Sequence, residues 1–257
     1  MNRGLYTAGA GMMLQLARQD VLSNNLANLS TAGYKKDTAV CKEFPTMLLQ
    51  RIFEISEENG VRKPIPPIEV GRIGTGATLD RTYTNYDAGS FRPSENNNDF
   101  ALRDHDTFFA VETPQGVRYT RNGQFQINNE GVLVTAQNDP VLGQKGQIVP
   151  GKDFVVNEKG EFTLADGTTD SLQIYRFEDL DSLKKIGASF YDPGDMSPVA
   201  APDAGVLQGY YEVSNVNPVQ EMVDLITVVR AYELSQKAVQ SEDEMTGQAV
   251  SQVGSLR

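Results

Sequence analysis

The chain has 257 residues, with 23 basic and 34 acidic side chains and a net charge of −11. It contains no long basic run, which argues against binding nucleic acid through a face that neutralises phosphates. Its one cysteine, Cys41, excludes an internal disulfide framework and a cysteine metal site. This length allows one large domain or two smaller ones, and 39% hydrophobic residues with 23 glycines indicate a folded, turn-rich protein.

No apolar run approaches the roughly 18–20 residues that a membrane-spanning helix needs. Polar residues also interrupt the opening segment, namely Gln15, Arg18, Gln19 and Asp20. We therefore expect no cleaved secretory signal, and a protein that stays in the cytoplasm or leaves it by another route.

Residues 3–29 predict an amphipathic helix. Apolar side chains recur at three- and four-residue spacing at Leu5, Ala8, Met12, Leu16, Leu22, Leu26 and Leu29. Gly4, Gly9 and Gly11 each cost about 1 kcal/mol relative to alanine, so the first turns need support from outside the helix. Asn28 and Gly33 favour turns and predict that the helix ends there.

Residues 34–81 read as an extended linker. An apolar stretch from Phe44 to Ile55 fits either a short helix or a strand, and its periodicity does not decide between them. Pro64, Pro66 and Pro67 then favour extended backbone. The glycines from 71 to 76 suggest a phosphate loop, but they lack a preceding apolar strand, a following helix and a lysine, so a nucleotide site is disfavoured.

Residues 82–211 predict an all-β domain rich in hairpins. Short runs of Val, Ile, Phe, Tyr and Thr alternate with Gly, Asn and Asp, as in FFAVET and VRYTRNG. Two segments resemble each other, each with a strand, an Asn-x-x-Gly turn and a returning strand. The first runs from Phe125 through Asn128 and Gly131, and the second from Phe154 through Asn157 and Gly160.

Residues 214–245 predict a second long helix. Asn217 suits the N-cap and Pro218 the first helical position, and no further Gly or Pro occurs until Gly247. Roughly 28 residues, about 40 Å, can therefore run as one helix. Apolar side chains spread over several of its faces, which indicates more than one neighbour. Either this helix and residues 3–29 pair as a coiled coil, or both are core helices of one compact domain.

The predicted fold class is α+β, with long N- and C-terminal helices pairing as a coiled coil and an inserted all-β, hairpin-rich and barrel-like domain. We expect an assembly helix in 1–33, a linker in 34–81, the β domain in 82–211 and a second assembly helix in 212–257.

The sequence offers little for catalysis. His105, the only histidine, lies between Asp104 and Asp106 and fits a polar turn. The acidic segments SENNND and FEDLD lack the spacing of a calcium loop, and the Gly-x-Ser-x-Gly, Cys-x-x-Cys and His-Glu-x-x-His motifs are absent. We expect no enzyme, no metal and no cofactor.

Three motifs resemble the rod proteins of the bacterial flagellar basal body, within the wider rod and hook family. They are SNNLANLSTAGYKK near the beginning, YTRNGQFQINNEGVLVTAQNDPVLG in the middle, and SNVNPVQEMVDLITVVRAYELSQKAVQSEDEM near the end. They occur in the family's order, and the resemblance covers essentially the whole chain.

This resemblance implies a structural subunit, exported by the flagellar type III apparatus and polymerised into the helical drive shaft between the inner-membrane ring and the hook. The implied partners are further copies, other rod subunits, hook and basal-body proteins and the export apparatus, and the implied location is the basal body outside the cytoplasm. Terminal helices of neighbouring subunits would form the inner layer. The expected assembly interface comprises Leu5, Met12, Leu22, Asn25, Leu26, Asn28, Thr31, Gly33, Tyr34, Asn215, Val216, Glu221, Met222, Leu225, Ile226, Val229, Arg230, Tyr232 and Val239. Phe44 and Leu48 resemble the short export-recognition element of such subunits, with local packing as the other interpretation.

Within the family, Asn217-Pro218-Val219 and Tyr6-Thr7-Ala8 favour the proximal-rod type, whereas the long segment before Gly74 is shared with the distal-rod type. A hook-type subunit is a further alternative. The sequence departs from the family at residues 104–107, where Asp-His-Asp-Thr replaces a glycine-containing turn before Phe108 and Phe109. A different class of function, an adhesin-like β binding module on a helical oligomerisation stalk, would instead require a ligand groove on the β domain.

Overall fold

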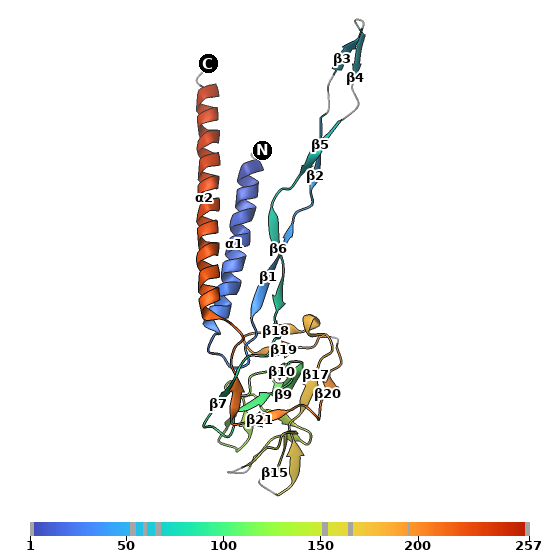
Figure 1. Ribbon diagram of the computed structural model, residues 1–257, viewed down its shortest axis with the longest axis vertical. Helices are drawn as coiled ribbons and strands as arrows, with labels where there is room; N and C mark the ends of the chain where they lie inside the picture. Colours follow the sequence, from blue (N-terminus) through green and yellow to red (C-terminus); the bar gives the residue numbers. More distant parts are fainter. Residues whose placement is uncertain are drawn as a thin grey trace. The chain divides into compact units, whose positions relative to one another are not determined.

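The computed structural model describes residues 3–51, 55–58, 61–64, 68–150, 154–163, 167–194 and 196–254 (Figure 1). The chain divides into two compact units. Unit 1 consists of Met1–Leu22, Ala39–Thr82 and Met222–Arg257, and unit 2 of Ser23–Thr38 and Tyr83–Glu221. Helices and strands pass from one unit to the other without a break in the chain.

Two long helices, α1 (Arg3–Ala27) and α2 (Pro218–Gly254), form at the two places that the sequence predicts. In unit 1 they run side by side in opposite directions (Figure 1). Gly4 of α1 lies against the carboxylate of Glu242, and a Cβ on Gly11 would lie 3.5 Å from Ser235 Oγ. These two contacts are one heptad apart on both helices.

Asn217 caps α2 as predicted. Its side-chain oxygen accepts from the backbone N–H of Val219 at 3.1 Å and of Gln220 at 3.4 Å. The expected end at Gly247 is wrong, because the helix continues through it to Gly254. One glycine costs only about 1 kcal/mol in a helix, which is too little to stop it.

The remaining part of unit 1 consists of β-strands, which resolves the choice between helix and strand left open around Phe44. Three strand pairs follow one another, β1 with β6, then β2 with β5 and β3 with β4, of which the last two are antiparallel. Pro64 closes β4, while Pro66 and Pro67 lie outside the described residues. The strands are β1 (Asp37–Glu43), β2 (Met47–Arg51), β3 (Ile55–Glu58), β4 (Val61–Pro64), β5 (Ile68–Ile73) and β6 (Ala77–Thr84).

Unit 2 contains the expected hairpin-rich β domain. Its largest sheet has six strands in the order β18-β19-β10-β9-β17-β20, and smaller pairs surround it. The strands are β7 (Phe91–Pro93), β8 (Phe100–Leu102), β9 (Thr107–Thr113), β10 (Gly116–Thr120), β11 (Gln126–Ile127), β12 (Leu133–Val134), β13 (Leu142–Gly143), β14 (Gly146–Gln147), β15 (Glu161–Thr163), β16 (Thr169–Ser171), β17 (Ile174–Arg176), β18 (Lys184–Ile186), β19 (Phe190–Asp192), β20 (Val199–Ala200), β21 (Val206–Gln208) and β22 (Tyr210–Glu212), with a short 3-10 helix at Leu180–Ser182.

The expectation of a barrel-like domain is not confirmed. Among the described residues, the six-stranded sheet ends at β18 and β20, which do not pair with each other. Many of the other strands are only two or three residues long, and such short ladders do not extend the sheet far enough to close it.

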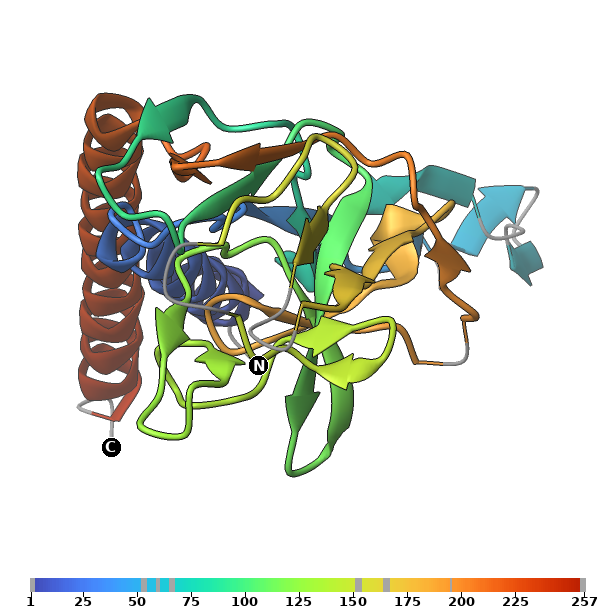
Figure 2. The same cartoon turned by 90° about the horizontal axis from the view of Figure 1, so that it is seen from below.

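The β9–β10 hairpin, green in Figure 2, organises the core of unit 2. Successive side chains of a strand point to opposite faces, so the adjacent aromatics of β9 enter different clusters. Phe109 packs with Phe100 and Phe125, while Phe108 packs with Tyr191 and other aromatic residues. One strand buried on both faces therefore joins two cores.

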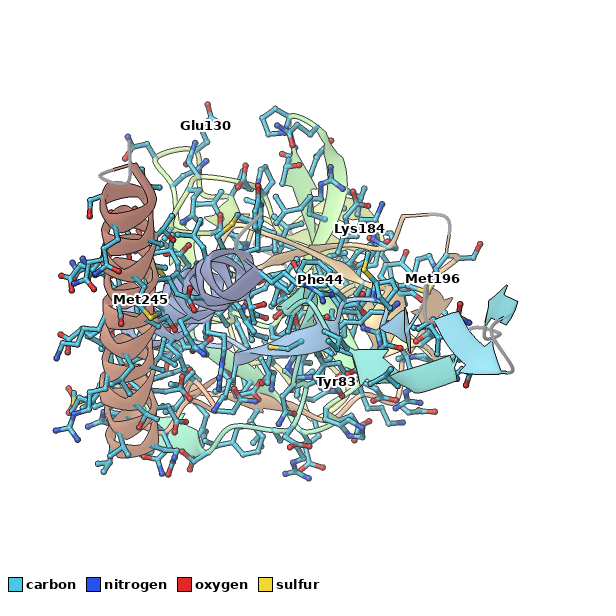
Figure 3. The ribbon with its side chains drawn as sticks, turned by 90° about the horizontal axis from the view of Figure 1, so that it is seen from above. Phe44, Tyr83, Glu130, Lys184, Met196 and Met245 are labelled. Carbon is cyan, nitrogen blue, oxygen red and sulfur yellow. The ribbon has the colours of Figure 1, made fainter. Side chains whose placement is uncertain are left out.

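The predicted duplicated turn is confirmed. Asn128 accepts from the backbone N–H of residues 130 and 132 through its side chain, and Asn157 does the same for 159 and 161. Gly131 has φ +82° and Gly160 φ +77°, the left-handed conformation that the repeat predicts for its glycines. Figure 3 shows the side chain of Glu130 extending outward from the first turn.

Candidate assembly interface

A buried carboxylate lies at the centre of unit 2. Glu212, the last residue of β22, accepts hydrogen bonds from Lys35 Nζ at 2.6 Å, Arg121 Nε at 2.8 Å and the backbone N–H of Gly89 at 2.8 Å. All three side chains of this ion cluster, which comprises Lys35, Arg121 and Glu212, are buried. The cluster joins segments that lie far apart in the sequence.

The ion cluster contains two cations but only one carboxylate. Backbone carbonyl oxygens accept the remaining hydrogen bonds of the two cations and so offset the excess positive charge. Arg121 Nη1 donates to the carbonyl oxygens of Asp104 at 2.5 Å and Thr107 at 2.7 Å, and Lys35 Nζ donates to that of Asp87 at 2.7 Å. A buried charge without such partners would cost several kcal/mol. The guanidinium thereby also fixes the turn that precedes β9.

These surroundings shift the pKa values of the cluster. Burial, followed by the charge of Arg121, lowers the pKa of Lys35 to about 8. Burial alone would raise the pKa of Glu212, but Arg121 and Lys35 outweigh that effect and lower it. The carboxylate therefore stays ionised at neutral pH.

A second polar cluster holds one end of each long helix. Asn25 in α1 is fully buried, and its side chain makes four hydrogen bonds. Its amide oxygen accepts from the backbone N–H of Asp37 at 2.9 Å and the hydroxyl of Tyr34 at 3.1 Å. Its amide nitrogen donates to the carbonyl of Asp37 at 2.8 Å and to the carboxylate of Glu221 in α2 at 3.1 Å. Lys36 forms an ion pair with the other oxygen of Glu221.

Asn215 extends this cluster to the loop before β7. Its side-chain oxygen accepts from the backbone N–H of Lys36 at 2.8 Å, and its amide nitrogen donates to the carbonyl of Asn85 at 2.9 Å. Gly33 is also bound in this region, because its backbone N–H donates to the carbonyl of Glu212 at 2.8 Å. The end of α1 and the start of α2 are thus bound to the same segments of unit 2.

The members of the expected interface near the helix ends are accordingly held inside this chain. Asn25, Gly33, Tyr34, Val216 and Glu221 are buried, and Asn28, Thr31 and Asn215 are half-buried. The structure brings Asn25, Tyr34 and Glu221 together through hydrogen bonds.

The members along the two helices are exposed or half-buried. Met222 and Ile226 are 50% and 53% exposed. Leu5 and Arg230 are also exposed, while the remaining apolar members are half-buried: Met12, Leu22, Leu26, Leu225, Val229, Tyr232 and Val239. Leu22 is in unit 1 and Leu26 in unit 2. The expected set omitted further exposed apolar side chains of the same helices, namely Tyr6, Met13, Leu16, Val219, Val223, Leu234, Met245 and Val250.

Phe44 lies beside α1 in unit 1 (Figure 3). It lines a hollow of about 630 Å³ together with Leu5, Met12 and Tyr232, and a second hollow of about 510 Å³ with Tyr6 and Met47. Leu48 is 48% exposed. Phe44 therefore packs locally, and the role of this pair in export stays a prediction.

The turn that departs from the family closes through an arginine. Arg176 Nη2 lies 2.8 Å from Asp104 Oδ2, and its Nε lies 2.8 Å from Asp106 Oδ2. The hydroxyl of Thr107 also donates to the carbonyl of Asp104 at 2.9 Å. Side-chain contacts thus hold the turn, in which none of residues 104–107 has a positive φ, and His105 remains exposed.

The sequence reasoning missed Lys35, Arg121 and Glu212. Lys35 and Arg121 each lie inside one of the three motifs, and Glu212 lies just before the third. The available signal was the presence of a charged residue, Lys35 or Arg121, inside a motif made mostly of turn-forming and apolar residues. Such a residue indicates a buried charge with a specific partner. Within the described ranges, no group of acidic, histidine and cysteine residues could hold a metal ion, and neither helix is long and apolar enough to cross a membrane.

A substitution at Gly33 tests how tightly the chain packs against the backbone of Arg121. Its φ is +67°, and a Cβ there would lie 2.4 Å from the carbonyl carbon of Arg121. We expect Gly33→Ala to lower the free energy of unfolding by roughly 2–5 kcal/mol, from left-handed strain and collision together. Gly187 is the control, because its φ of +63° is similar and a Cβ there would meet nothing within 4 Å. Equal losses in urea denaturation of the two alanine variants would contradict this packing.

The lowered pKa of Lys35 predicts that the free energy of unfolding depends on pH. Its pKa is about 8 in the folded chain and 10.5 ordinarily, so between these values the unfolded chain binds more protons. The free energy of unfolding should therefore rise with pH across this window, by roughly 3 kcal/mol. Urea denaturation at several pH values measures the rise, which Lys35→Met should reduce and Lys184→Met, at an exposed position, should retain. A smaller rise should remain in Lys35→Met, because burial also lowers the pKa of Lys185. From about pH 10 upward, buried Tyr34 works in the opposite direction, because burial raises its pKa above the ordinary value of 10.0.

Three family models match separate parts of the chain. "Flagella basal body rod protein" matches residues 5–35, "Flagellar hook protein FlgE/F/G D1 domain" matches 104–174, and "Flagellar basal body rod FlgEFG protein C-terminal" matches 207–252. They contain Lys35, Arg121 and Glu212 respectively, so the three matches meet at the ion cluster.

Curated relatives match over nearly the full length. The flagellar hook-basal body complex protein FlhO of Bacillus subtilis is 30% identical, with 100% of both chains covered. The flagellar basal-body rod protein FlgG of Caulobacter vibrioides is 31% identical over 98% of this chain and 100% of its own. FlgG of Agrobacterium fabrum is also 31% identical, over 95% and 96%. The chain therefore belongs to the flagellar basal-body rod family.

Proposed function

We propose that this protein is a structural subunit of the flagellar basal-body rod, located in the basal body and active as a building block rather than as an enzyme. The flagellar type III apparatus exports it, and it polymerises into the helical drive shaft between the inner-membrane ring and the hook. Its partners are further copies, other rod subunits, and hook and basal-body proteins. The observation that carries this proposal is the row of exposed apolar side chains on two long helices.

The exposed side chains supply the energy for assembly. Met222, Val223 and Ile226 each leave about half of their surface exposed on α2. Full burial of such a side chain contributes about 1.5–3 kcal/mol, so covering the exposed half of each contributes roughly 1 kcal/mol. A helix of a second copy laid along this row gains several such contributions at once.

Pairing of α1 and α2 as a coiled coil is part of the proposal. Heptad spacing supports it, because a series of positions on α2 that avoid exposure repeats in steps of four and three: Glu221, Leu225, Val228, Tyr232, Ser235, Val239 and Glu242. The contacts of Glu242 with Gly4 and of Ser235 with Gly11 lie in this series. The pair then presents its outer faces to neighbouring subunits.

In this arrangement, residues 1–33 and 212–257 serve as assembly helices, 34–81 as the linker and 82–211 as the outer β domain. The polar residues Asn25, Tyr34 and Glu221 act indirectly, by holding the helix ends on the β domain. Phe44 and Leu48 serve as the export element, which the exposed side chain of Leu48 supports.

Ile226→Asp tests the apolar row. A carboxylate at this exposed position does not disturb the core of either unit, but it must be desolvated when a second copy covers it. We expect a cell with this variant to lack motility and to stop rod assembly, while the purified protein keeps its far-UV circular dichroism. Val117→Asp, at an exposed apolar position of β10 that is 45% accessible, should assemble normally. Normal rods with Ile226→Asp would contradict the proposal.

The proposal includes a proximal position along the rod, and deletion of the gene tests that position separately. In a strain that lacks this gene, a proximal subunit leaves basal bodies without any rod beyond the inner-membrane ring. A distal subunit leaves a short rod stub instead. We expect the first result in electron micrographs of isolated basal bodies, and a stub of regular length would place the protein distally.

A further inference from the structure

Residues 199–214, which contain the last strands of unit 2, pair with strands in three separate sheets. β20 pairs with β17, β21 with β8 and β22 with β7. Among the described strands, β7 and β8 have no other partner, because each belongs to a two-stranded sheet. One continuous segment near the end of unit 2 therefore binds parts of the fold that the described ladders do not otherwise join.

The segment also fills one of the two core clusters of unit 2. Ala204 and Val206 are 0% and 3% exposed and belong to the cluster that contains Phe109. The cluster that contains Phe108 has no member in 199–214 among the described residues. Removal of the segment would therefore open the Phe109 cluster and leave the Phe108 cluster filled.

The side chain of Gln208 takes the place of a strand ladder. Its Oε1 accepts from the backbone N–H of Val156 at 2.9 Å, and its Nε2 donates to the carbonyl of Phe154 at 3.1 Å. Phe154 and Val156 belong to the Phe109 cluster but lie outside the described strands. Their backbone groups thus depend on residues 199–214 for these bonds.

The same segment supplies the only carboxylate of the ion cluster, Glu212. Its two partners precede it by a long stretch of chain, Lys35 by 177 residues and Arg121 by 91. Until Glu212 arrives, a fully compact unit 2 would bury two cations without a counter-ion, and burial of an unpaired charge is strongly unfavourable. Complete burial of Lys35 and Arg121 therefore has to wait for residues 199–214.

Most other strand pairs of unit 2 are local, unlike those of residues 199–214. β9 ends at Thr113 and its partner β10 begins at Gly116, and β11–β12, β13–β14, β15–β16 and β18–β19 are also consecutive strands. Gln208, by contrast, donates to the carbonyl of Asn97, 111 residues earlier. Closing a long loop costs entropy before its contacts form, so local hairpins form ahead of such pairings.

We propose that residues 199–214 form a closing strap, which docks after the local hairpins and the Phe108 cluster have formed and undocks before they unfold. The undocked state opens the Phe109 cluster and the ion cluster, while the sheet around β9 and β10 loses only its edge strand β20. A chain delivered from its N-terminus must supply 212 of its 257 residues before the ion cluster closes. This inference goes beyond the proposed rod function and does not rest on it.

Folding kinetics of the full chain test the order of docking. Val206→Ala removes the same two methyl groups from the strap as Val111→Ala removes from the β9–β10 hairpin, and the two side chains are 3% and 0% exposed. We expect Val206→Ala to raise the unfolding rate by on the order of tenfold and to leave the folding rate within about twofold, because its contacts form after the transition state.

Val111→Ala is the matched control and should slow folding several-fold, because the hairpin is formed in the transition state. Stopped-flow tyrosine fluorescence in urea gives both rates for each variant, since the chain has ten tyrosines and no tryptophan. If Val206→Ala slows folding by as large a factor as Val111→Ala, the strap docks together with the hairpin, and the proposal is overturned.

Amide hydrogen exchange of the native full chain tests the order of undocking. The backbone N–H groups of Val206 and Val213 bind the carbonyls of Glu158 and Ser90, and that of Ala110 in β9 binds the carbonyl of Gln173. We expect Val206 and Val213 to show at least about tenfold less protection than Ala110, because the strap opens on its own. Equal protection would mean that the strap opens only when the whole unit unfolds, and would overturn the proposal.

Glu212→Gln should widen this difference in protection, because it weakens the strap and leaves the β9–β10 hairpin unchanged. Should this variant not fold, Val206→Ala provides the same comparison through a smaller change. A difference that does not widen in the folded variant would also count against the strap. None of these outcomes bears on the assembly defect expected of Ile226→Asp, so the strap and the rod function can fail separately.

Discussion

The rest of unit 2 depends on the hydrogen bonds and ion pairs that the buried carboxylate of Glu212 forms. It holds a lysine that follows α1, an arginine that follows the central hairpin and the backbone before β7. None of these segments is adjacent in sequence, and each leads to a different part of the fold. Through Arg121 the same cluster reaches the turn before β9, the strand that joins both cores. Removal of this charge would leave two buried cations facing each other.

The ion cluster and the polar cluster around Asn25 together use residues of all three motifs. The first motif supplies Lys35 and Asn25, the second supplies Arg121, and the third supplies Glu221. Their residues meet in one region of unit 2, where polar side chains bind backbone groups of distant segments. Such bonds need fixed geometry, so the motifs specify the attachment of the helices.

Local signals in the sequence predicted local structure well. Asn217 and Pro218 located the start of α2, and the repeated Asn-x-x-Gly located two turns with the same hydrogen bonds. Periodicity could not decide between helix and strand near Phe44, because only pairing with a distant segment makes that stretch β. The ion cluster was unpredictable for a similar reason, since one sequence does not show which lysine meets which glutamate. The expected interface combined two kinds of residue: polar residues that bind the helix ends to the β domain, and apolar residues exposed on the helices. Only their burial in the structure distinguishes the two kinds.

The fixed helix ends have a consequence for how the helices order. Forming the first turn of a helix is the costly step, with a nucleation constant on the order of 10⁻³, whereas each later residue adds at little cost. Asn217 and Asn25 hold one turn of each helix in place through side-chain hydrogen bonds. Both helices can therefore propagate from turns that already exist. In α1, growth from Asn25 reaches the glycines at 11, 9 and 4 last, so that the weakest helical segment is also the one furthest from its nucleus.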